Sequence, residues 1–168
     1  MKKTSNYKQR LQAITTFVFD VDGVFTNGEI FYHPNGETIR SYNAKDGYAV
    51  KEAVDKGYKI AVITRGDSNL VKDVFSSIGV FDVFLAVMDK ASVLDSFLTK
   101  NNINYNEVLY MGDDIPDLEC IKMVGIGTCP RDAVREIRNI ADYVSTFEGG
   151  KGAVRDVVEQ TLRMQGKW

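Results

Sequence analysis

The sequence predicts an α/β fold, with a doubly wound, Rossmann-like parallel sheet and helices on both of its faces. Short apolar segments typical of buried strands alternate along the chain with segments whose apolar residues recur at helical spacing. Parallel strands in such an alternation are joined by right-handed crossovers, which place helices over the sheet. The chain has 168 residues, of which 44% are hydrophobic. This is enough to form one compact hydrophobic core, but the chain is short for two such cores. We therefore expect residues 1–168 to form a single domain.

Six apolar segments are expected to form the sheet. The strands are predicted at residues 14–21, 59–64, 80–87, 108–114, 125–127 and 143–144. Consecutive Val and Phe residues in the first of them indicate burial on both faces. Amphipathic periodicity predicts helices at residues 46–56, 68–78, 90–101, 117–123, 132–139 and 153–163.

A β-hairpin is predicted between the first two strands. Residues 29–33 and 37–42 flank Pro34, Asn35 and Gly36, which are a strong turn signal. A hairpin of this size is marginally stable alone, so it has to pack on another surface.

Composition and charge exclude several functions. The 21 basic and 23 acidic residues give a formal charge of −2, and no basic run is long enough to suggest nucleic-acid binding. No apolar segment approaches the length of a membrane span, and the first residues lack the apolar core of a signal peptide. Cys120 and Cys129 match no metal-ligand spacing and form no disulfide framework. The expected compartment is the cytoplasm.

The segment FVFDVDGVF, residues 17–25, places two acidic residues at the end of the first strand. Asp20 and Asp22 are two residues apart, so their side chains leave the strand end in roughly the same direction. Neighbouring carboxylates repel each other unless a cation lies between them. The pattern indicates a Mg²⁺ site with one carboxylate left for chemistry. The alternative interpretation is an acidic turn after a buried strand.

Polar side chains also follow three other strands. Thr64 ends the second strand, Lys90 follows the third, and Asp113 and Asp114 end the fourth. Ligands bind outside the carboxyl ends of the strands in open parallel sheets. We therefore expect a hydroxyl, an amine and several carboxylates to converge with Asp20 at one edge of the sheet.

This ordered set of motifs resembles the haloacid dehalogenase (HAD) superfamily of phosphohydrolases, and the match covers nearly the whole chain. The resemblance implies that Asp20 is the nucleophile and that Asp22 is the general acid and base. It also implies that Asp20, Asp113 and the backbone carbonyl of Asp22 bind Mg²⁺, which offsets the repulsion between a carboxylate and a phosphate. Thr64 would donate a hydrogen bond to a phosphoryl oxygen, and Lys90 would neutralise charge on the transferring group.

Three further polar residues are assigned roles from their positions. Asp114 is expected to orient Lys90 or a metal-bound water. Asp117 is interpreted either as an assisting group or as a charge at the N-terminus of a helix. His33 is the single histidine, and it is expected on the surface of the hairpin.

The chain lacks room for the cap domain that most HAD enzymes carry. Only a hairpin and a helix separate Asp22 from Thr64, and only a helix and a strand separate Thr64 from Lys90. An open site favours macromolecular substrates, or an oligomer in which a neighbour supplies the lid.

Within the superfamily, the chain resembles the capless 3-deoxy-D-manno-octulosonate 8-phosphate (KDO 8-phosphate) phosphatases. The matching segments are FDVDGVFTNGEIFY, NAKDGY, YMGDDIPDLECIKMVGIG, ADYVST and GGKGAVRDVVE. The resemblance implies a homotetramer assembled through the hairpins, in which a neighbouring subunit and its C-terminal tail help to close each site.

The same resemblance implies a substrate-binding loop. It would consist of Asn43, Ala44, Lys45, Asp46 and Gly47, with Lys51 behind it and Lys90 at the phosphate. Lys45 stands where the family usually has arginine, so a point charge replaces a bidentate grip on a carboxylate.

Other departures from the family also concern arginines. The family commonly has Thr-Gly-Arg after the second strand, whereas this chain has Thr64, Arg65 and Gly66. A further family arginine falls on Val74. Arg65, and Arg155 of a neighbouring subunit, are the candidates to replace the missing cations in substrate binding.

The predicted function is Mg²⁺-dependent hydrolysis of the phosphate ester of a 2-keto-3-deoxy sugar acid, with KDO 8-phosphate as the first candidate. An alternative substrate is 2-keto-3-deoxynononate 9-phosphate (KDN 9-phosphate), whose phosphatases share nearly all the motifs. The alternative outside the enzymes is a non-catalytic tetramerisation module that retains the fold. The intact set of motifs argues against this module, because paired carboxylates destabilise a fold when no metal is bound.

Overall fold

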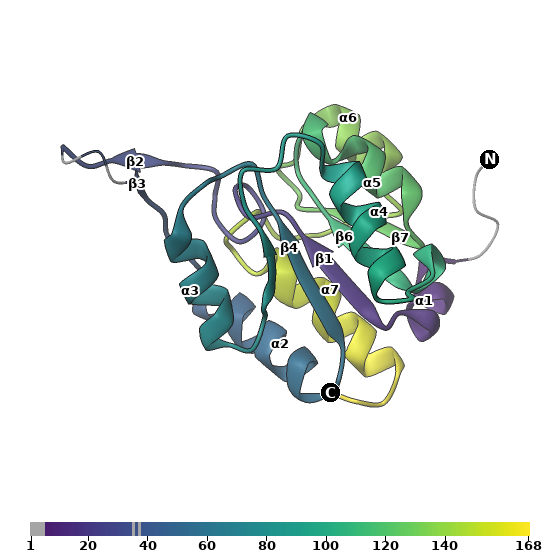
Figure 1. The fold of residues 1–168 in the computed structure, drawn as a ribbon. Coiled ribbons are helices and arrows are strands. Elements are labelled where there is room, and N and C mark those ends of the chain that lie inside the picture. The colour runs from purple at the N-terminus through teal and green to yellow at the C-terminus, as the bar shows by residue number, and fades with distance from the viewer. Residues whose placement is uncertain (1–5, 35, 37) are drawn as a thin grey trace.

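The computed structural model describes residues 6–34, 36 and 38–168, and its centre is a six-stranded parallel sheet (Figure 1). The order of the strands is β5-β4-β1-β6-β7-β8. Their bounds are β1 (Thr16–Phe19), β4 (Lys59–Ile63), β5 (Asp82–Phe84), β6 (Val108–Met111), β7 (Ile126–Cys129) and β8 (Tyr143–Val144). Every pairing within this sheet is parallel, which confirms the predicted fold class.

Helices cover both faces of the sheet (Figure 1). One face packs against α2 (Ala44–Asp55), α3 (Asn69–Ser77) and α7 (Ala153–Met164), together with the short N-terminal α1 (Tyr7–Arg10) and η1 (Leu11–Ala13). The other packs against α4 (Lys90–Lys100), α5 (Leu118–Met123) and α6 (Arg135–Ile140). Two 3₁₀ turns, η2 (Tyr105–Glu107) and η3 (Ile115–Asp117), precede β6 and α5.

Strand β1 lies in the middle of the sheet and is buried on both sides, as its sequence predicts. Phe17 and Phe19 belong to the core between the sheet and α2, α3 and α7, whereas Val18 belongs to the opposite core. The alternation follows from the two-residue period of a strand. Asp20 directly follows Phe19, so it stands at the carboxyl end of a buried, well-packed strand.

The hairpin is shorter than predicted and projects from the body of the protein (Figure 1). Its strands β2 (Phe31–Tyr32) and β3 (Thr38–Ile39) pair antiparallel. Asn35 of the predicted turn and Glu37 at the predicted start of the second strand lie outside the described residues. Phe31 and Tyr32 are exposed by 58% and 80%, so the hairpin offers apolar surface that this chain does not cover.

No cap domain stands over the sheet in the described part of the chain. Only the hairpin and α2 lie between β1 and β4, and only α3 and β5 lie between β4 and α4. None of the described helices has the length and apolar character needed to span a bilayer.

The start of α2 differs from the prediction. The polar segment 43–48 is expected to lead as a loop into a helix that begins at about residue 46, but the helix begins at Ala44. The Asn43 side chain accepts a hydrogen bond from the backbone nitrogen of Lys45 at 2.9 Å, which caps the first turn. The expected substrate loop is thus mostly a helical turn.

Candidate active site

A cavity of about 260 Å³ lies at the carboxyl ends of β1, β4 and β6. The five residues predicted to carry the chemistry all line it, together with Gly28, Arg65, Asp114 and Pro116. They are Asp20, Asp22, Thr64, Lys90 and Asp113. The structure therefore brings together four segments of sequence at one edge of the sheet, as the rule for parallel sheets requires.

Lys90 is the first residue of α4 and is almost completely buried beneath this cavity. Its Nζ lies 2.8 Å from Oδ2 of Asp20 and 2.7 Å from Oδ1 of Asp117. Asp89 precedes it as the N-cap, with its side chain accepting from the Ser92 nitrogen at 3.1 Å. This cap fixes the start of the helix, so the lysine stem points inward to two carboxylates.

Asp117, for which the sequence allowed two roles, is a partner of Lys90. It is completely buried, and its Oδ1 also accepts a hydrogen bond from the Tyr110 hydroxyl at 2.7 Å. Its Oδ2 accepts from the backbone nitrogens of Asp113 and Asp114 at 3.1 and 3.4 Å. Asp117 therefore holds both the lysine and the turn that carries Asp113.

Asp114 does not orient Lys90, and that part of the expectation is wrong. Its Oδ1 accepts from the backbone nitrogen of Ile115 at 2.7 Å, so the side chain folds back onto its own turn. Asp117 occupies the position beside the amine instead. Asp114 still lines the cavity, and its contact with a metal-bound water stays a prediction.

The carboxylates of Asp20, Asp113 and Asp117 crowd one another. Each offers an oxygen that lies within 4.8 Å of the others. Burial and the charge of Asp117 raise the pKa of Asp20 from 3.8 to about 7, although Lys90 opposes the shift. Burial and the charge of Asp20 raise the pKa of Asp113 to about 8. The cluster carries more negative charge than one lysine compensates, which is the condition that a divalent cation relieves.

Asp117 is a poor candidate for a metal ligand, because the hydrogen bonds described above already engage both of its oxygens. Asp20 and Asp113 have oxygens that face the cavity, and they fit hard-cation coordination better.

The backbone at residue 23 requires a glycine after the two aspartates. Its φ of +83° lies in the left-handed region, and a Cβ built there would stand 2.0 Å from Oδ2 of Asp113. Any side chain would therefore displace Asp113 from the cluster.

Thr64 is buried at the end of β4, and its Oγ1 accepts a hydrogen bond from the Gly66 nitrogen at 3.1 Å. A hydroxyl that accepts from the backbone keeps its own hydrogen for a further acceptor. The geometry is compatible with donation to a phosphoryl oxygen in the cavity.

Asp22 makes a contact that the sequence did not predict. Arg40, directly after β3, donates from Nε to Oδ1 of Asp22 at 2.7 Å and from Nη2 to Oδ2 at 3.2 Å. The Asp22 carboxylate raises the pKa of Arg40. No local motif marks this pair, because its members lie 18 positions apart.

The predicted substrate loop lies away from this cavity. Asp46 is buried, and its carboxylate accepts from the backbone nitrogens of Gly152 and Arg155 at 3.2 and 2.8 Å. It therefore caps α7, and its role in a substrate loop stays a prediction. Asn43 donates to the Gly150 carbonyl at 3.2 Å. Both residues attach α2 to the C-terminal helix.

The other predicted substrate residues lie in several parts of the structure. Lys45 and Arg155 line a separate cavity of about 530 Å³ along α7, and Lys51 is exposed and paired with Asp55. Ala44 and Gly47 belong to the first turn of α2. Arg65 and Lys90 are the predicted substrate residues that lie with Asp20, and Arg65 stands at the exposed rim of the active-site cavity. Val74 lines a third, apolar cavity.

Known proteins resemble this chain over most of its length. A family model for haloacid dehalogenase-like hydrolases matches residues 66–156. The 3-deoxy-D-manno-octulosonate 8-phosphate phosphatase of Haemophilus influenzae is 31% identical over 160 residues, which cover 95% of this chain and 89% of that protein. Its counterpart in Escherichia coli K12 is 33% identical over 158 residues, covering 94% and 84%.

Solved structures agree with these relatives. The phosphatase of the same name from Yersinia pestis superimposes with a TM-score of 0.95 at 29% identity, covering 97% of this chain and 88% of its own. The Moraxella catarrhalis enzyme, crystallised with a magnesium ion, a phosphate ion and KDO, gives a TM-score of 0.93 at 29% identity, covering 98% and 94%.

Proposed function

The chain belongs to the haloacid dehalogenase-like hydrolases, and from that premise we propose that it hydrolyses KDO 8-phosphate to KDO and phosphate through a phosphoaspartate intermediate. It is a phosphoric monoester hydrolase. The observation that carries the proposal is the buried Lys90, whose amine contacts Asp20 at 2.8 Å beside a cavity that also contains Thr64 and Asp22.

Asp20 is proposed as the nucleophile and Asp22 as the proton carrier. An Asp20 oxygen forms a bond to phosphorus while the bond between phosphorus and the sugar oxygen breaks, and Asp22 gives its proton to that oxygen. Asp22 then takes a proton from water, whose oxygen attacks phosphorus and releases the Asp20 carboxylate. Lys90 and Thr64 contact the phosphoryl oxygens during both transfers.

Mg²⁺ is the cofactor. Asp20, Asp113 and the backbone carbonyl of Asp22 would hold the ion, and the buried, mutually repelling carboxylates fit it. When bound, the ion supplies positive charge that lets an anionic nucleophile approach an anionic ester.

In the absence of Mg²⁺, we expect the free energy of unfolding to fall as the pH rises from about 4 to about 8. The pKa values of Asp20 and Asp113 are raised in the folded state, so the folded protein binds more protons than the unfolded chain in this interval. Thermal melts in chelator at about pH 5 and about pH 8 test this, and added Mg²⁺ should raise the melting temperature more at the higher pH. A matched monovalent salt is the control, and an equal Mg²⁺ effect at both pH values would contradict the assignment.

The substrate is proposed from the relatives and from the cations at the cavity. Arg65 lines the rim of the active-site cavity, and a sugar acid needs a cation for its own carboxylate. KDN 9-phosphate is the second candidate, because its phosphatases share the same motifs.

A phosphate-release assay should rank KDO 8-phosphate above KDN 9-phosphate, and both above hexose phosphates by at least about tenfold in kcat/KM. The reason is that hexose phosphates lack the carboxylate that would pair with Arg65 at the rim of the cavity. Preference for a hexose phosphate would reject the sugar-acid substrate and retain only the reaction. No phosphate release from any of them would favour the non-catalytic module.

We also propose that the chain is a homotetramer in the cytoplasm, with a neighbour covering each open site. The exposed Phe31, Tyr32 and Ile39 of the hairpin support an assembly, because their apolar surface would otherwise face water. Lys45 and Arg155, which line a separate cavity in one chain, would in this proposal serve a neighbouring site.

Light scattering should give a mass near four chains for the purified protein. Replacing both hairpin aromatics, Phe31→Ser with Tyr32→Ser, should lower the mass and reduce kcat/KM, because the shared lid would be lost. The exposed Phe81 provides the control Phe81→Ser, which lies outside the hairpin. A fully active monomer would refute the shared lid.

A further inference from the structure

Arg40 connects the hairpin to the active site through all of its guanidinium nitrogens. Nε and Nη2 bind the two oxygens of Asp22 at 2.7 and 3.2 Å, and Nη1 donates to Oγ1 of Thr38 at 2.9 Å. A bidentate arginine fixes both the position and the plane of a carboxylate, which a single contact cannot do. The orientation of the Asp22 carboxylate is therefore fixed by Arg40, which lies in a different segment of the chain.

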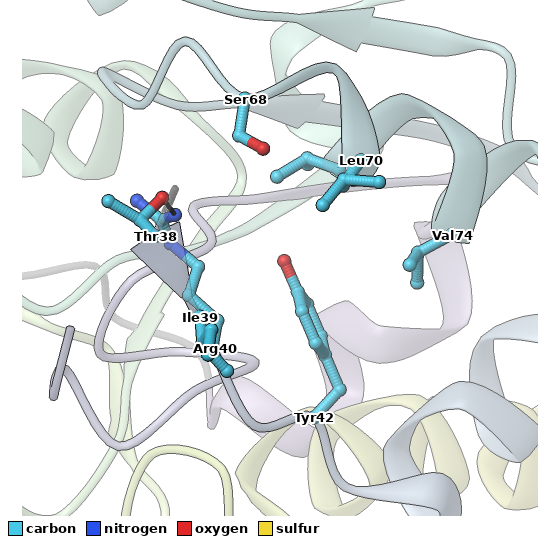
Figure 2. A pocket seen from close by; sticks show the side chains of 8 residues that line it. Thr38, Ile39, Arg40, Tyr42, Ser68, Leu70 and Val74 are labelled. Carbon is cyan, nitrogen blue, oxygen red and sulfur yellow. Dashed lines mark hydrogen bonds between the residues drawn. The ribbon is translucent and has the colours of Figure 1, made fainter. Parts of the chain in front are cut away.

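The stem of Arg40 is itself held in place. Its side chain is only 10% exposed, against 27% for Asp22. It lines an apolar cavity of about 270 Å³ whose other walls include Tyr42, Leu70 and Val74, with Thr38 beside its head group (Figure 2). Because the side chain is largely buried and its head group makes three hydrogen bonds, Arg40 is held in one conformation beside the Asp22 carboxylate.

The contact between Arg40 and Asp22 lies beside Gly66 and Thr64. An ideal Cβ at Gly66 would stand 3.4 Å from Nη2 of Arg40, 3.5 Å from Oγ1 of Thr64 and 3.7 Å from Oδ2 of Asp22. These three polar groups thus surround one backbone position at the end of β4. Asp22 is held where it also neighbours the hydroxyl expected to bind a phosphoryl oxygen.

We propose that Arg40 is a positioning residue for Asp22, holding its carboxylate in the orientation from which it exchanges protons with the sugar oxygen and with water. The inference rests on the proposed function, because it presupposes proton transfer by Asp22. The ion pair also ties this orientation to the hairpin, since Arg40 immediately follows β3 and binds Thr38 within it.

Arg40→Met keeps the apolar stem and removes the guanidinium. We expect kcat for KDO 8-phosphate to fall about 10- to 100-fold with KM changed by less than about threefold, since a misplaced proton donor slows chemistry more than binding. Arg40→Lys, which retains one contact, should recover part of the loss. Thr38→Val should give a smaller loss of the same kind.

Two readouts separate positioning from a merely structural role. In the Asp22→Asn background, Arg40→Met should cause no further loss of turnover, because the carboxylate it orients is gone. The burst of p-nitrophenol from p-nitrophenyl phosphate should stay close to that of the wild type in Arg40→Met, because this leaving group needs no proton. Equal losses in both backgrounds, or a burst slowed as much as sugar-phosphate turnover, would overturn the proposal.

Failure of the proposed function has a different signature. Unchanged turnover in Asp22→Asn alone would reject proton transfer by Asp22, whereas an impaired Asp22→Asn with a normal Arg40→Met would reject only the role of Arg40. Arg10 is the matched control, because its Nη2 pairs with Asp142 at 2.7 Å with side-chain exposures of 19% and 18%. Arg10→Met should lower the melting temperature and leave kcat unchanged.

Discussion

Asp20→Asn should abolish Mg²⁺-dependent phosphate release, with turnover falling by a factor of about 10⁴ or more while the protein stays folded. An amide oxygen at this position cannot form the phosphoaspartate, and Asp20 is the carboxylate that contacts both Lys90 and the cavity. The measurement is phosphate release at saturating substrate, with circular dichroism and thermal melts to establish folding.

The stability of the same variant distinguishes a lost nucleophile from a damaged fold. Asp20 is buried, and its raised pKa reflects an unfavourable carboxylate in the metal-free protein. Asp20→Asn should therefore melt at a higher temperature than the wild type in chelator at about pH 8, and it should respond little to Mg²⁺. Asp73→Asn, an exposed site on α3, is the matched control and should change neither property. Turnover at the level of the wild type in Asp20→Asn would reject the nucleophile assignment.

The sequence predicted the parts of the site that depend on strand ends. Asp20, Thr64 and Asp113 each follow a buried apolar run, and parallel strands carry whatever follows them to the same edge. Lys90 was predicted from its place in the order of motifs, and the start of α4 delivers it to the same cavity. The shared location of these residues follows from local pattern and topology, whereas their roles came from the family resemblance.

The contacts missed from the sequence are those between side chains far apart along the chain. Arg40 and Asp22 are 18 positions apart, and Lys90 and Asp117 are 27 apart. The two members of each pair lie in different segments of the fold, so no periodicity within a single helix or strand predicts the contact. Asp46 was assigned to a substrate loop from the family resemblance, and its contacts with the start of α7 are a further long-range pairing that the sequence did not predict.

The ammonium of Lys90 partly offsets the negative charge of the carboxylates in the site. Three carboxylates share this corner of the fold, and the described residues place one ammonium among them. The amine lies between Asp20, which lines the cavity, and Asp117, which is buried and accepts a hydrogen bond from the Tyr110 hydroxyl. Lys90 thus serves stability and chemistry at once, and a single substitution should expose both roles.

Lys90→Met should lower the free energy of unfolding by about 3 to 5 kcal/mol near neutral pH, because it leaves buried carboxylates without their counter-charge. Methionine replaces the stem at similar volume, so the loss reports the missing ammonium more than a cavity. Urea unfolding followed by circular dichroism measures the loss. Phosphate release should fall by about 10² to 10³ as well, because charge on the transferring phosphoryl group is no longer neutralised.

The pH dependence identifies the cause of this instability. Lys90 lowers the pKa of Asp20 in the wild type, so removing the ammonium raises that pKa further. The folded variant then binds extra protons and loses stability as the pH rises. Below the ordinary carboxyl pKa of 3.8, the Asp20 carboxyl is protonated in both the folded and the unfolded state, and the deficit relative to the wild type should shrink. Lys100→Met, at the exposed end of the same helix, controls for the substitution itself. A deficit of the same size at about pH 4 and about pH 8 would mean that packing, and not charge, makes Lys90 necessary to the fold.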